Sequence, residues 1–217
     1  MLVSPSLLSA DFLHIGDAVR LLNAHADLIH LDLMDGVLVP NLSFGFSVSD
    51  AVCSAAAIPT DAHLMTVHPW RWFAHLQRKG VRYISFHLEA AGGDAAQHLA
   101  ALRGMGVKAG LAIDPDVPVH KLYPYIGMAD FFVIMSVYAG FGGQKFIPES
   151  IGRIAALKSE ILRRGDSALI EVDGGVSVSN AQALREAGAG ILVAGSAVFG
   201  APDPAAVIRS LKRPAVR

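Results

Sequence analysis

Short apolar runs alternate with longer amphipathic stretches along the whole chain, and this alternation predicts eight strands separated by helices. The predicted strands cover residues 3–8, 28–33, 60–65, 83–87, 108–113, 131–136, 168–173 and 191–194. The predicted helices cover residues 15–23, 47–57, 70–78, 94–105, 119–126, 148–164, 180–187 and 204–211. Repeated strand–helix units of this kind are typical of a parallel sheet covered by helices.

Eight units with no remainder favour one α/β domain over residues 1–217, folded as a single (β/α)₈ TIM barrel. The chain has 217 residues, 53% of them hydrophobic, which suffices for one large α/β domain or two small ones. No serine-rich, proline-rich or charged linker divides it. An open doubly wound sheet is the alternative, because periodicity alone does not exclude it. The polar residues favour the barrel, since they fall at the carboxyl ends of strands, where barrel enzymes build their catalytic loops.

Four acid or imidazole side chains interrupt the apolar strands, and together they predict a metal site. His30 and Asp32 lie in LIHLDLMDG, His63 in TDAHLM and Asp173 in LIEVDGG. Side chains two residues apart share one face of a strand, so His30 and Asp32 lie on the same face. A single histidine on an apolar strand is more often a hydrogen-bonded core residue. Two imidazoles beside two carboxylates suit one divalent cation, such as Fe, Mn, Co or Zn.

The two aspartates also predict acid–base chemistry. In an eight-strand ring the second and seventh strands lie three steps apart, so Asp32 and Asp173 would face each other across the barrel mouth. One carboxylate could remove a proton while the other delivers one from the opposite side, which inverts a stereocentre next to a carbonyl. A structural ion pair or a helix cap is the alternative. Acid–base catalysis contributes only roughly 10²–10⁴ in rate, so we expect the cation to stabilise the enolate as a Lewis acid.

Glycine-rich loops follow the last three predicted strands and indicate a phosphorylated substrate. Glycine lets backbone N–H groups approach an anion closely, and the loops after strands 7 and 8 are the usual phosphate site of barrels. Each loop could instead need glycine only for a tight turn. The final loop also opens a short segment, 196–199, whose N–H groups could bind an anion. The residues of these loops are Gly140, Phe141, Gly142 and Gly143, then Gly174 and Gly175, then Gly195 and Ser196.

Charge and cysteine content limit the partners and the compartment. The net charge is -1 and no segment concentrates Lys or Arg, so we expect no nucleic-acid partner. A single cysteine, Cys53, excludes an internal disulfide and fits a reducing compartment. The amino-terminal segment has no basic region of a signal peptide. The longest uncharged apolar stretch, 187–202, is broken by glycines and shorter than the roughly 20 residues that span a bilayer. We therefore expect a cytoplasmic protein without a membrane segment.

Six ordered motifs resemble the ribulose-phosphate 3-epimerase family, and the resemblance runs from Ser4 to about Phe199. The motifs are PSLLSADF, HLDLMDG with VPN, DAHLM, MSV with GFGGQKF, EVDGG and VAGSAVFG. The resemblance implies a (β/α)₈ barrel of the ribulose-phosphate-binding type. It also implies an isomerase of the pentose phosphate pathway that interconverts D-ribulose 5-phosphate and D-xylulose 5-phosphate through a metal-stabilised cis-enediolate.

The resemblance also assigns roles to individual residues. It places Asp32 on the family's proton acceptor and Asp173 on its proton donor, and Ser6 on a serine that contacts the substrate. The implied metal ligands are His30, Asp32, His63 and Asp173. The implied substrate-binding residues are Ser6, His63, Gly140, Phe141, Gly142, Gly143, Asp173, Gly174, Gly175, Gly195 and Ser196.

Two departures from the family pattern leave the exact sugar open. Val37 follows MDG where family members often carry His, and Tyr138-Ala139 precedes GFGG where they often carry Asn-Pro or Asp-Pro. D-allulose-6-phosphate 3-epimerases share the metal and acid–base set, so they are an alternative. A Schiff-base aldolase would need a lysine at an interior strand end, but Lys108 opens a strand and Lys145 lies in a loop. A phosphosugar-binding barrel without catalysis is the alternative outside enzymes, and it would not need both carboxylates.

Two further expectations concern assembly and His87. Barrels of this kind often associate, so we expect a homo-oligomer, either a dimer or a hexamer. His87, at the end of the fourth predicted strand, could line the cavity or be a buried, hydrogen-bonded histidine.

Overall fold

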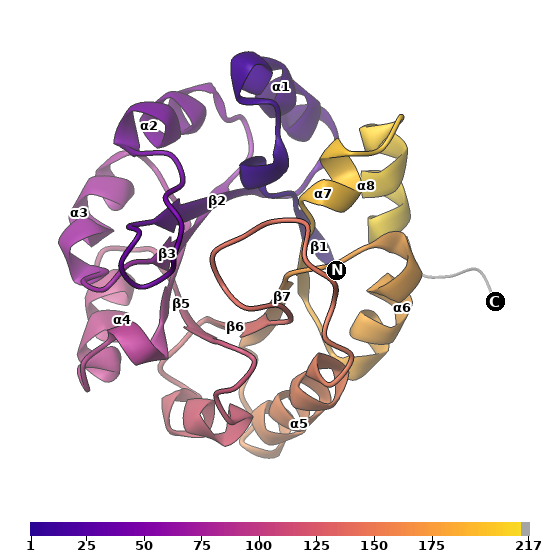
Figure 1. Ribbon diagram of the computed structural model, residues 1–217. Helices are drawn as coiled ribbons and strands as arrows, with labels where there is room; N and C mark the ends of the chain where they lie inside the picture. Colours follow the sequence, from indigo (N-terminus) through magenta and orange to yellow (C-terminus); the bar gives the residue numbers. More distant parts are fainter. Residues whose placement is uncertain (214–217) are drawn as a thin grey trace.

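Eight parallel strands and the helices between them make up the computed structural model, which describes residues 1–213 (Figure 1). The strands are β1 (Leu2–Ser4), β2 (Ile29–Met34), β3 (Thr60–Met65), β4 (Tyr83–His87), β5 (Lys108–Ile113), β6 (Phe131–Met135), β7 (Leu169–Asp173) and β8 (Ile191–Val193). They form one sheet in the order β1-β8-β7-β6-β5-β4-β3-β2, and all neighbouring pairs in that order are parallel.

Backbone hydrogen bonds join β1 to β2, the two outer strands of this order, and nearly close the sheet into a barrel. The Leu28 N–H donates to the Val3 carbonyl at 3.3 Å, and the His30 N–H donates to the Pro5 carbonyl at 3.1 Å. Ser6 and His30 form a parallel bridge one step further on. The predicted (β/α)₈ barrel is therefore confirmed.

Helices surround the barrel and alternate with the strands (Figure 1). The α-helices are α1 (Ile15–His25), α2 (Phe46–Ala55), α3 (Trp70–Arg78), α4 (Ala95–Gly104), α5 (Ser150–Arg163), α6 (Val178–Ala187), α7 (Ser196–Phe199) and α8 (Pro204–Lys212). Four 3₁₀ helices lie within the described residues, namely η1 (Leu7–Ser9), η2 (Phe12–His14), η3 (Leu88–Ala90) and η4 (Val119–Tyr125).

Prolines account for the two clearest differences from the predicted elements. The predicted strand 3–8 ends at Ser4, because Pro5 has no N–H to donate and the Ser6 hydroxyl accepts the Leu8 N–H at 3.1 Å to start η1. The predicted helix 119–126 is the 3₁₀ helix η4, which has Pro124 inside it. A proline within this segment cannot donate the hydrogen bond that an α-helix requires.

Apolar side chains form two clusters, one on each side of the sheet. The larger cluster joins outward-facing strand residues, such as Leu31, Leu64 and Ile134, to the surrounding helices. The smaller cluster comes from the alternate strand positions and so lies inside the barrel. It includes Met34, Met65, Ala112, Phe131, Val133 and Met135. The polar residues of β2, β3 and β7 share this interior, which places the predicted site residues there.

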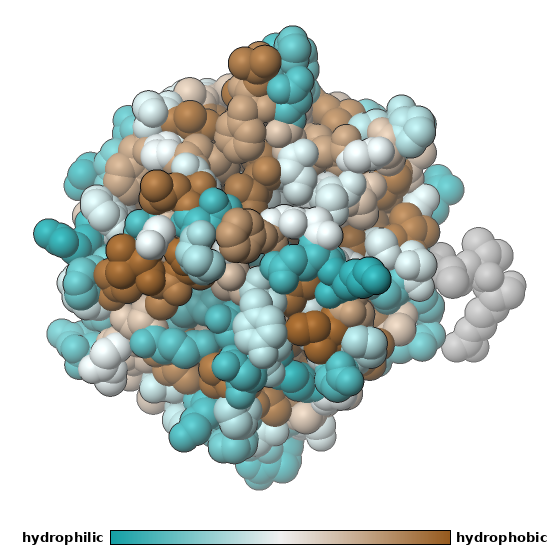
Figure 2. Space-filling model, viewed as in Figure 1, coloured by the Kyte–Doolittle hydropathy of each residue, from teal (hydrophilic) through white to brown (hydrophobic). Residues whose placement is uncertain are grey.

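The segment between β6 and α5 crosses the middle of the barrel in the view of Figure 1. Hydrophobic and hydrophilic side chains are interspersed over the same face in Figure 2. Among the described helices, none combines the length and the apolar character needed to cross a bilayer.

Aromatic side chains occupy the amino-terminal end of the barrel interior. Phe131, the first residue of β6, is fully buried, and its ring centroid lies 5.7 Å from that of Tyr83, the first residue of β4. Gly110 on β5 faces the same ring. A Cβ atom at Gly110 would lie 2.3–2.7 Å from three ring atoms of Phe131. The glycine therefore makes room for the ring, and this end of the barrel is packed.

We expect Gly110→Ala to lower the free energy of unfolding by about 1–3 kcal/mol, because a close-packed interior gives the Phe131 ring little room to move. Urea denaturation of the variant and the parent measures the difference. Gly152→Ala is the control, since a Cβ at Gly152 in α5 has nothing within 4 Å. Alanine there should raise helix stability by roughly 0.5–1 kcal/mol. A Gly110→Ala variant as stable as the parent would contradict the close contact.

Candidate metal centre and active site

The carboxyl ends of β2, β3 and β7 bring together His30, Asp32, His63 and Asp173. Each residue offers one ligand atom, and these atoms all lie within 4.8 Å of one another. The register of the sheet explains part of the arrangement, because Asp32 on β2 pairs with His63 on β3. Both histidines are fully buried, whereas the Asp173 side chain keeps 13% of its surface exposed. The four side chains therefore form one group at the edge of the barrel interior.

One ring nitrogen of each histidine points into this group without a hydrogen-bond partner in the described structure. His30 Nε2 lies 3.3 Å from Asp32 Oδ1 and 4.0 Å from Asp173 Oδ2. His63 Nδ1 lies 3.5 Å from Asp173 Oδ2. A buried polar atom without a partner costs free energy, and coordination to a cation would offset that cost. Two imidazole nitrogens and two carboxylates fit a divalent cation.

The carboxylates set the charge of this group. Burial alone lowers the pKa of His30, but the Asp32 and Asp61 carboxylates outweigh burial and raise that pKa well above its usual value. Burial raises the pKa of Asp32, and His30, with help from the Ser6 hydroxyl, brings it below its usual value. Burial lowers the pKa of His63. The carboxylates therefore attract positive charge, from a proton or a cation, while His63 is kept neutral as a ligand must be.

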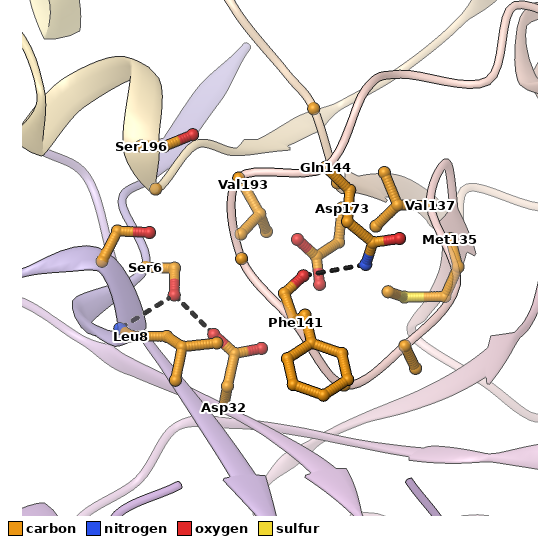
Figure 3. Close-up of a pocket in the computed structure, with 18 of the residues that line it drawn as sticks. Ser6, Leu8, Asp32, Met135, Val137, Phe141, Gln144, Asp173, Val193 and Ser196 are labelled. Carbon is orange, nitrogen blue, oxygen red and sulfur yellow. Dashed lines mark hydrogen bonds between the residues drawn. The ribbon is translucent and has the colours of Figure 1, made fainter. Parts of the chain in front are cut away.

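Ser6 contacts Asp32 directly. Its hydroxyl donates to Asp32 Oδ2 at 2.5 Å and accepts the Leu8 N–H at 3.1 Å (Figure 3). The Ser43 hydroxyl donates to the backbone carbonyl of Asp32 at 2.5 Å and accepts the Met34 N–H at 3.0 Å. Asp32 is thus held at both its carboxylate and its backbone. The predicted role of Ser6 was a substrate contact, and sequence reasoning did not identify its bond to Asp32.

A second set of buried polar residues lies on the Nδ1 side of the His30 ring, away from the group of four residues. His30 Nδ1 lies 2.8 Å from Asp61 Oδ2, which also accepts the Ser4 hydroxyl at 3.4 Å. Glu171 is fully buried, and neither of its carboxyl oxygens has a hydrogen-bond partner among the described residues. Burial, followed by repulsion from the Asp61 carboxylate, raises the pKa of Glu171 well above its usual value. Burial and the nearby Asp61 side chain therefore favour the neutral form of Glu171.

A pocket opens beside Asp32 and Asp173 (Figure 3). Three methionines, Met34, Met65 and Met135, form part of its wall. His63, whose side chain is fully buried, is not among the residues that line it. All the other predicted substrate-binding residues line it, namely Ser6, Gly140, Phe141, Gly142, Gly143, Asp173, Gly174, Gly175, Gly195 and Ser196.

The β6–α5 loop borders this pocket and is tied to its neighbours. Asn41 Nδ2 donates to the Gly140 carbonyl at 2.7 Å, which joins the β2–α2 and β6–α5 loops. Gln144 Nε2 donates to the carbonyls of Tyr138 and Phe141 at 2.7 and 2.9 Å. A Cβ at Gly174, whose φ is +110°, would lie 2.4 Å from Val137. Glycine is therefore required where the β7–α6 loop closely approaches the start of the β6–α5 loop.

The two departures from the family pattern differ in their relation to the pocket. Tyr138 and Ala139 line it. Val37 is 72% exposed and does not line the pocket.

The fold and the group of four residues define a TIM barrel with a candidate metal centre at the carboxyl ends of its strands, the place where barrel enzymes carry their active sites. The sequence pattern of the ribulose-phosphate 3-epimerase family matches residues 2–199. The chain therefore belongs to the ribulose-phosphate 3-epimerase family, and the predicted assignment to an isomerase family of enzymes is confirmed.

Two named relatives are similar in sequence to this chain over almost its whole length. A ribulose-phosphate 3-epimerase of Synechocystis is 41% identical, over 99% of this chain and 95% of its own. A ribulose-phosphate 3-epimerase of Mycobacterium tuberculosis is 38% identical, over 99% of this chain and 93% of its own. A solved structure of 3-hexulose-6-phosphate synthase is similar in fold, with a TM-score of 0.74 at 18% identity, covering 97% of this chain and 98% of that one.

We expect Glu171→Gln to gain stability relative to the parent as the pH rises from about 5 to about 8. The carboxyl of glutamate titrates at about 4.3 in an unfolded chain. Because the folded pKa is higher, folding takes up a proton between the two values, and the parent loses stability as pH rises toward the folded pKa. The amide of glutamine can donate to Asp61 without that proton. Thermal unfolding across this pH range measures the difference in Tm.

Glu160→Gln is the control for this prediction. Arg163 and Arg164 lower the pKa of the Glu160 carboxyl to about 2, so it is ionised in the folded protein throughout the same range. Its Tm difference from the parent should not change with pH. A pH-independent difference for Glu171→Gln would show that Glu171 is ionised in the folded protein.

Proposed function

We propose that the protein epimerises a ketose phosphate at C3 and interconverts D-ribulose 5-phosphate and D-xylulose 5-phosphate. The arrangement of Asp32 and Asp173 carries this proposal. Their carboxylates come from β2 and β7, line one pocket and approach the same atom, His30 Nε2, to 3.3 and 4.0 Å. Inversion of a carbon next to a carbonyl requires a base on one face and an acid on the other. Family membership supports the choice of sugar phosphate.

The two aspartates divide the proton transfers between them. Asp32 accepts the C3 proton, which leaves a cis-enediolate, and Asp173 then donates a proton to C3 from the opposite face. The Ser6 hydroxyl supports the first step, because its bond to Asp32 Oδ2 favours the ionised carboxylate and fixes its direction. In the reverse reaction the two aspartates exchange roles.

The same residues would hold one divalent cation, and Fe, Mn, Co and Zn all suit the set of His30, Asp32, His63 and Asp173. When bound, the cation supplies Lewis-acid stabilisation, worth several kcal/mol, for the negative charge that develops on the sugar oxygens. The two histidines prepare this site by directing one unpartnered ring nitrogen each toward the carboxylates.

The phosphate group of the substrate would lie against the loops after β7 and β8. Gly174, Gly175, Gly195 and Ser196 line this side of the pocket, and barrels commonly bind phosphate there through backbone N–H groups. Tyr138 and Ala139 in the β6–α5 loop would determine which sugar length fits. The single domain, the cytoplasmic location and the homo-oligomeric assembly, dimer or hexamer, stay predictions from the sequence.

We expect Asp173→Asn to reduce kcat/KM by at least roughly 10²–10⁴, because the amide cannot donate the proton. The parent with its cation should incorporate solvent deuterium at C3 of ribulose 5-phosphate, which NMR of the sugar detects. Asp203→Asn is the matched control, since Asp203 caps α8 through the Ala206 N–H and asparagine caps a helix equally well. Absence of exchange in the metal-replete parent would refute the epimerisation mechanism.

Removal of the cation by a chelator should abolish turnover and lower the Tm, and one equivalent of cation per chain should restore both. A ligand present at 100 times its Kd stabilises the folded state by about 2.7 kcal/mol. His63→Ala, which lacks one ligand, should show a weaker Tm response to added cation. The same samples compare ribulose 5-phosphate with allulose 6-phosphate as substrates. Full turnover after complete metal removal would exclude the cation from the mechanism.

A further inference from the structure

His87, the last residue of β4, contacts the side of His63 that faces away from the group of four residues. The two Nε2 atoms lie 2.9 Å apart, and the ring planes differ by only 5°. The ring centroids, at 4.9 Å, are further apart than the two nitrogens, so the nitrogens point toward each other. Both rings are buried, with His63 at 0% and His87 at 2% exposure. Bulk water therefore does not compete for this contact.

Two imidazole nitrogens at this distance form a hydrogen bond, in which one nitrogen carries the proton and donates it while the other accepts. A histidine that binds a cation through Nδ1 carries no proton on that atom. Neutral His63 then carries its proton on Nε2 and donates it to His87 Nε2. Neutral His87, whose Nε2 accepts, carries its own proton on Nδ1. The geometry thus links the tautomers of the two rings.

The surroundings of His87 favour this assignment. His87 Nδ1 lies 4.0 Å from Glu89 Oε1. One ring nitrogen of His87 and one carboxyl oxygen each of Glu89 and Asp114 lie within 4.8 Å of one another. The backbone N–H of Asp114 donates to Glu89 Oε1 at 3.1 Å, which fixes the position of the Glu89 carboxylate. Acidic groups on this side of the ring favour a proton on Nδ1.

We propose that His87 is a positioning residue of the metal centre, which accepts the Nε2–H of His63 and so presents His63 Nδ1 to the cation. This inference rests on the metal site of the proposed function and extends it to a histidine outside the pocket. The other histidine of the centre has a charged partner instead, since His30 Nδ1 lies 2.8 Å from Asp61 Oδ2. Partners of this kind orient a ligand histidine and raise its affinity for metal.

Substitution of His87 tests the role through metal affinity. His87→Phe keeps a flat ring but has no acceptor, and we expect it to bind Co²⁺ about 10- to 100-fold more weakly than the parent. His87→Gln offers an amide oxygen as acceptor and should recover most of that affinity. His98→Phe is the matched control, because His98 packs against Phe73 and Phe86 outside the centre. Competition with a chromophoric chelator measures the affinities, and circular dichroism checks the fold.

A second measurement on the parent does not depend on any variant. Long-range ¹H–¹⁵N spectra of the Zn²⁺-loaded protein report which nitrogen of each histidine carries a proton, and a His63→Gln variant assigns the His63 signals. We expect a proton on His63 Nε2 and none on Nδ1. A His63 without a proton on Nε2 would overturn the proposal, as would a folded His87→Phe variant that binds Co²⁺ as tightly as the parent.

The two proposals can fail in distinguishable ways. A parent that binds neither Co²⁺ nor Zn²⁺ refutes the metal site. Because the role of His87 rests on that site, the same result refutes the positioning role as well. A parent that binds metal, combined with an unaffected His87→Phe variant, refutes only the role of His87.

Discussion

Closure of the sheet between β1 and β2 depends on a few backbone hydrogen bonds, and the site depends on that closure. The carbonyls of Val3 and Pro5 accept N–H groups from the start of β2. Asp27 fixes the same corner, since its carboxylate accepts the Val3 N–H and the Lys212 ammonium of α8, both at 2.9 Å. The first and last parts of the described chain therefore meet where the barrel closes. In an open sheet, Asp173 would not face Asp32.

The side chains inside the barrel change from apolar to ionisable along the barrel axis. Aromatic and aliphatic side chains fill the amino-terminal end, where Phe131 lies against Gly110. Toward the carboxyl ends, histidines and carboxylates replace them. Burial of so many ionisable groups costs free energy, and hydrogen bonds such as that between His30 and Asp61 offset only part of the cost. The surrounding apolar core between strands and helices must supply the remaining stability.

Alternation of polar and apolar residues predicted eight strands, and the position of the polar residues at the strand ends favoured the barrel and singled out His30, Asp32, His63 and Asp173. The alternation correctly placed His30 and Asp32 on one face, because side-chain direction in a strand repeats every two residues. It did not reveal the partners of His63 and His87, because contacts between strands depend on register, which a single strand does not encode. Asp61 was detectable, since it lies two residues before His63 on the same face.

Because the amino-terminal end of the barrel is packed, the pocket beside Asp32 and Asp173 is closed at that end. Phe131 and Tyr83 fill the barrel floor, so the pocket under the β6–α5 loop communicates with solvent on one side. In an epimerase, both sugars would enter and leave the pocket through this single opening. A bound molecule of one sugar would exclude the other. The two epimers would therefore compete for the same site, and the direction of net conversion would depend on how far their ratio in solution lies from equilibrium.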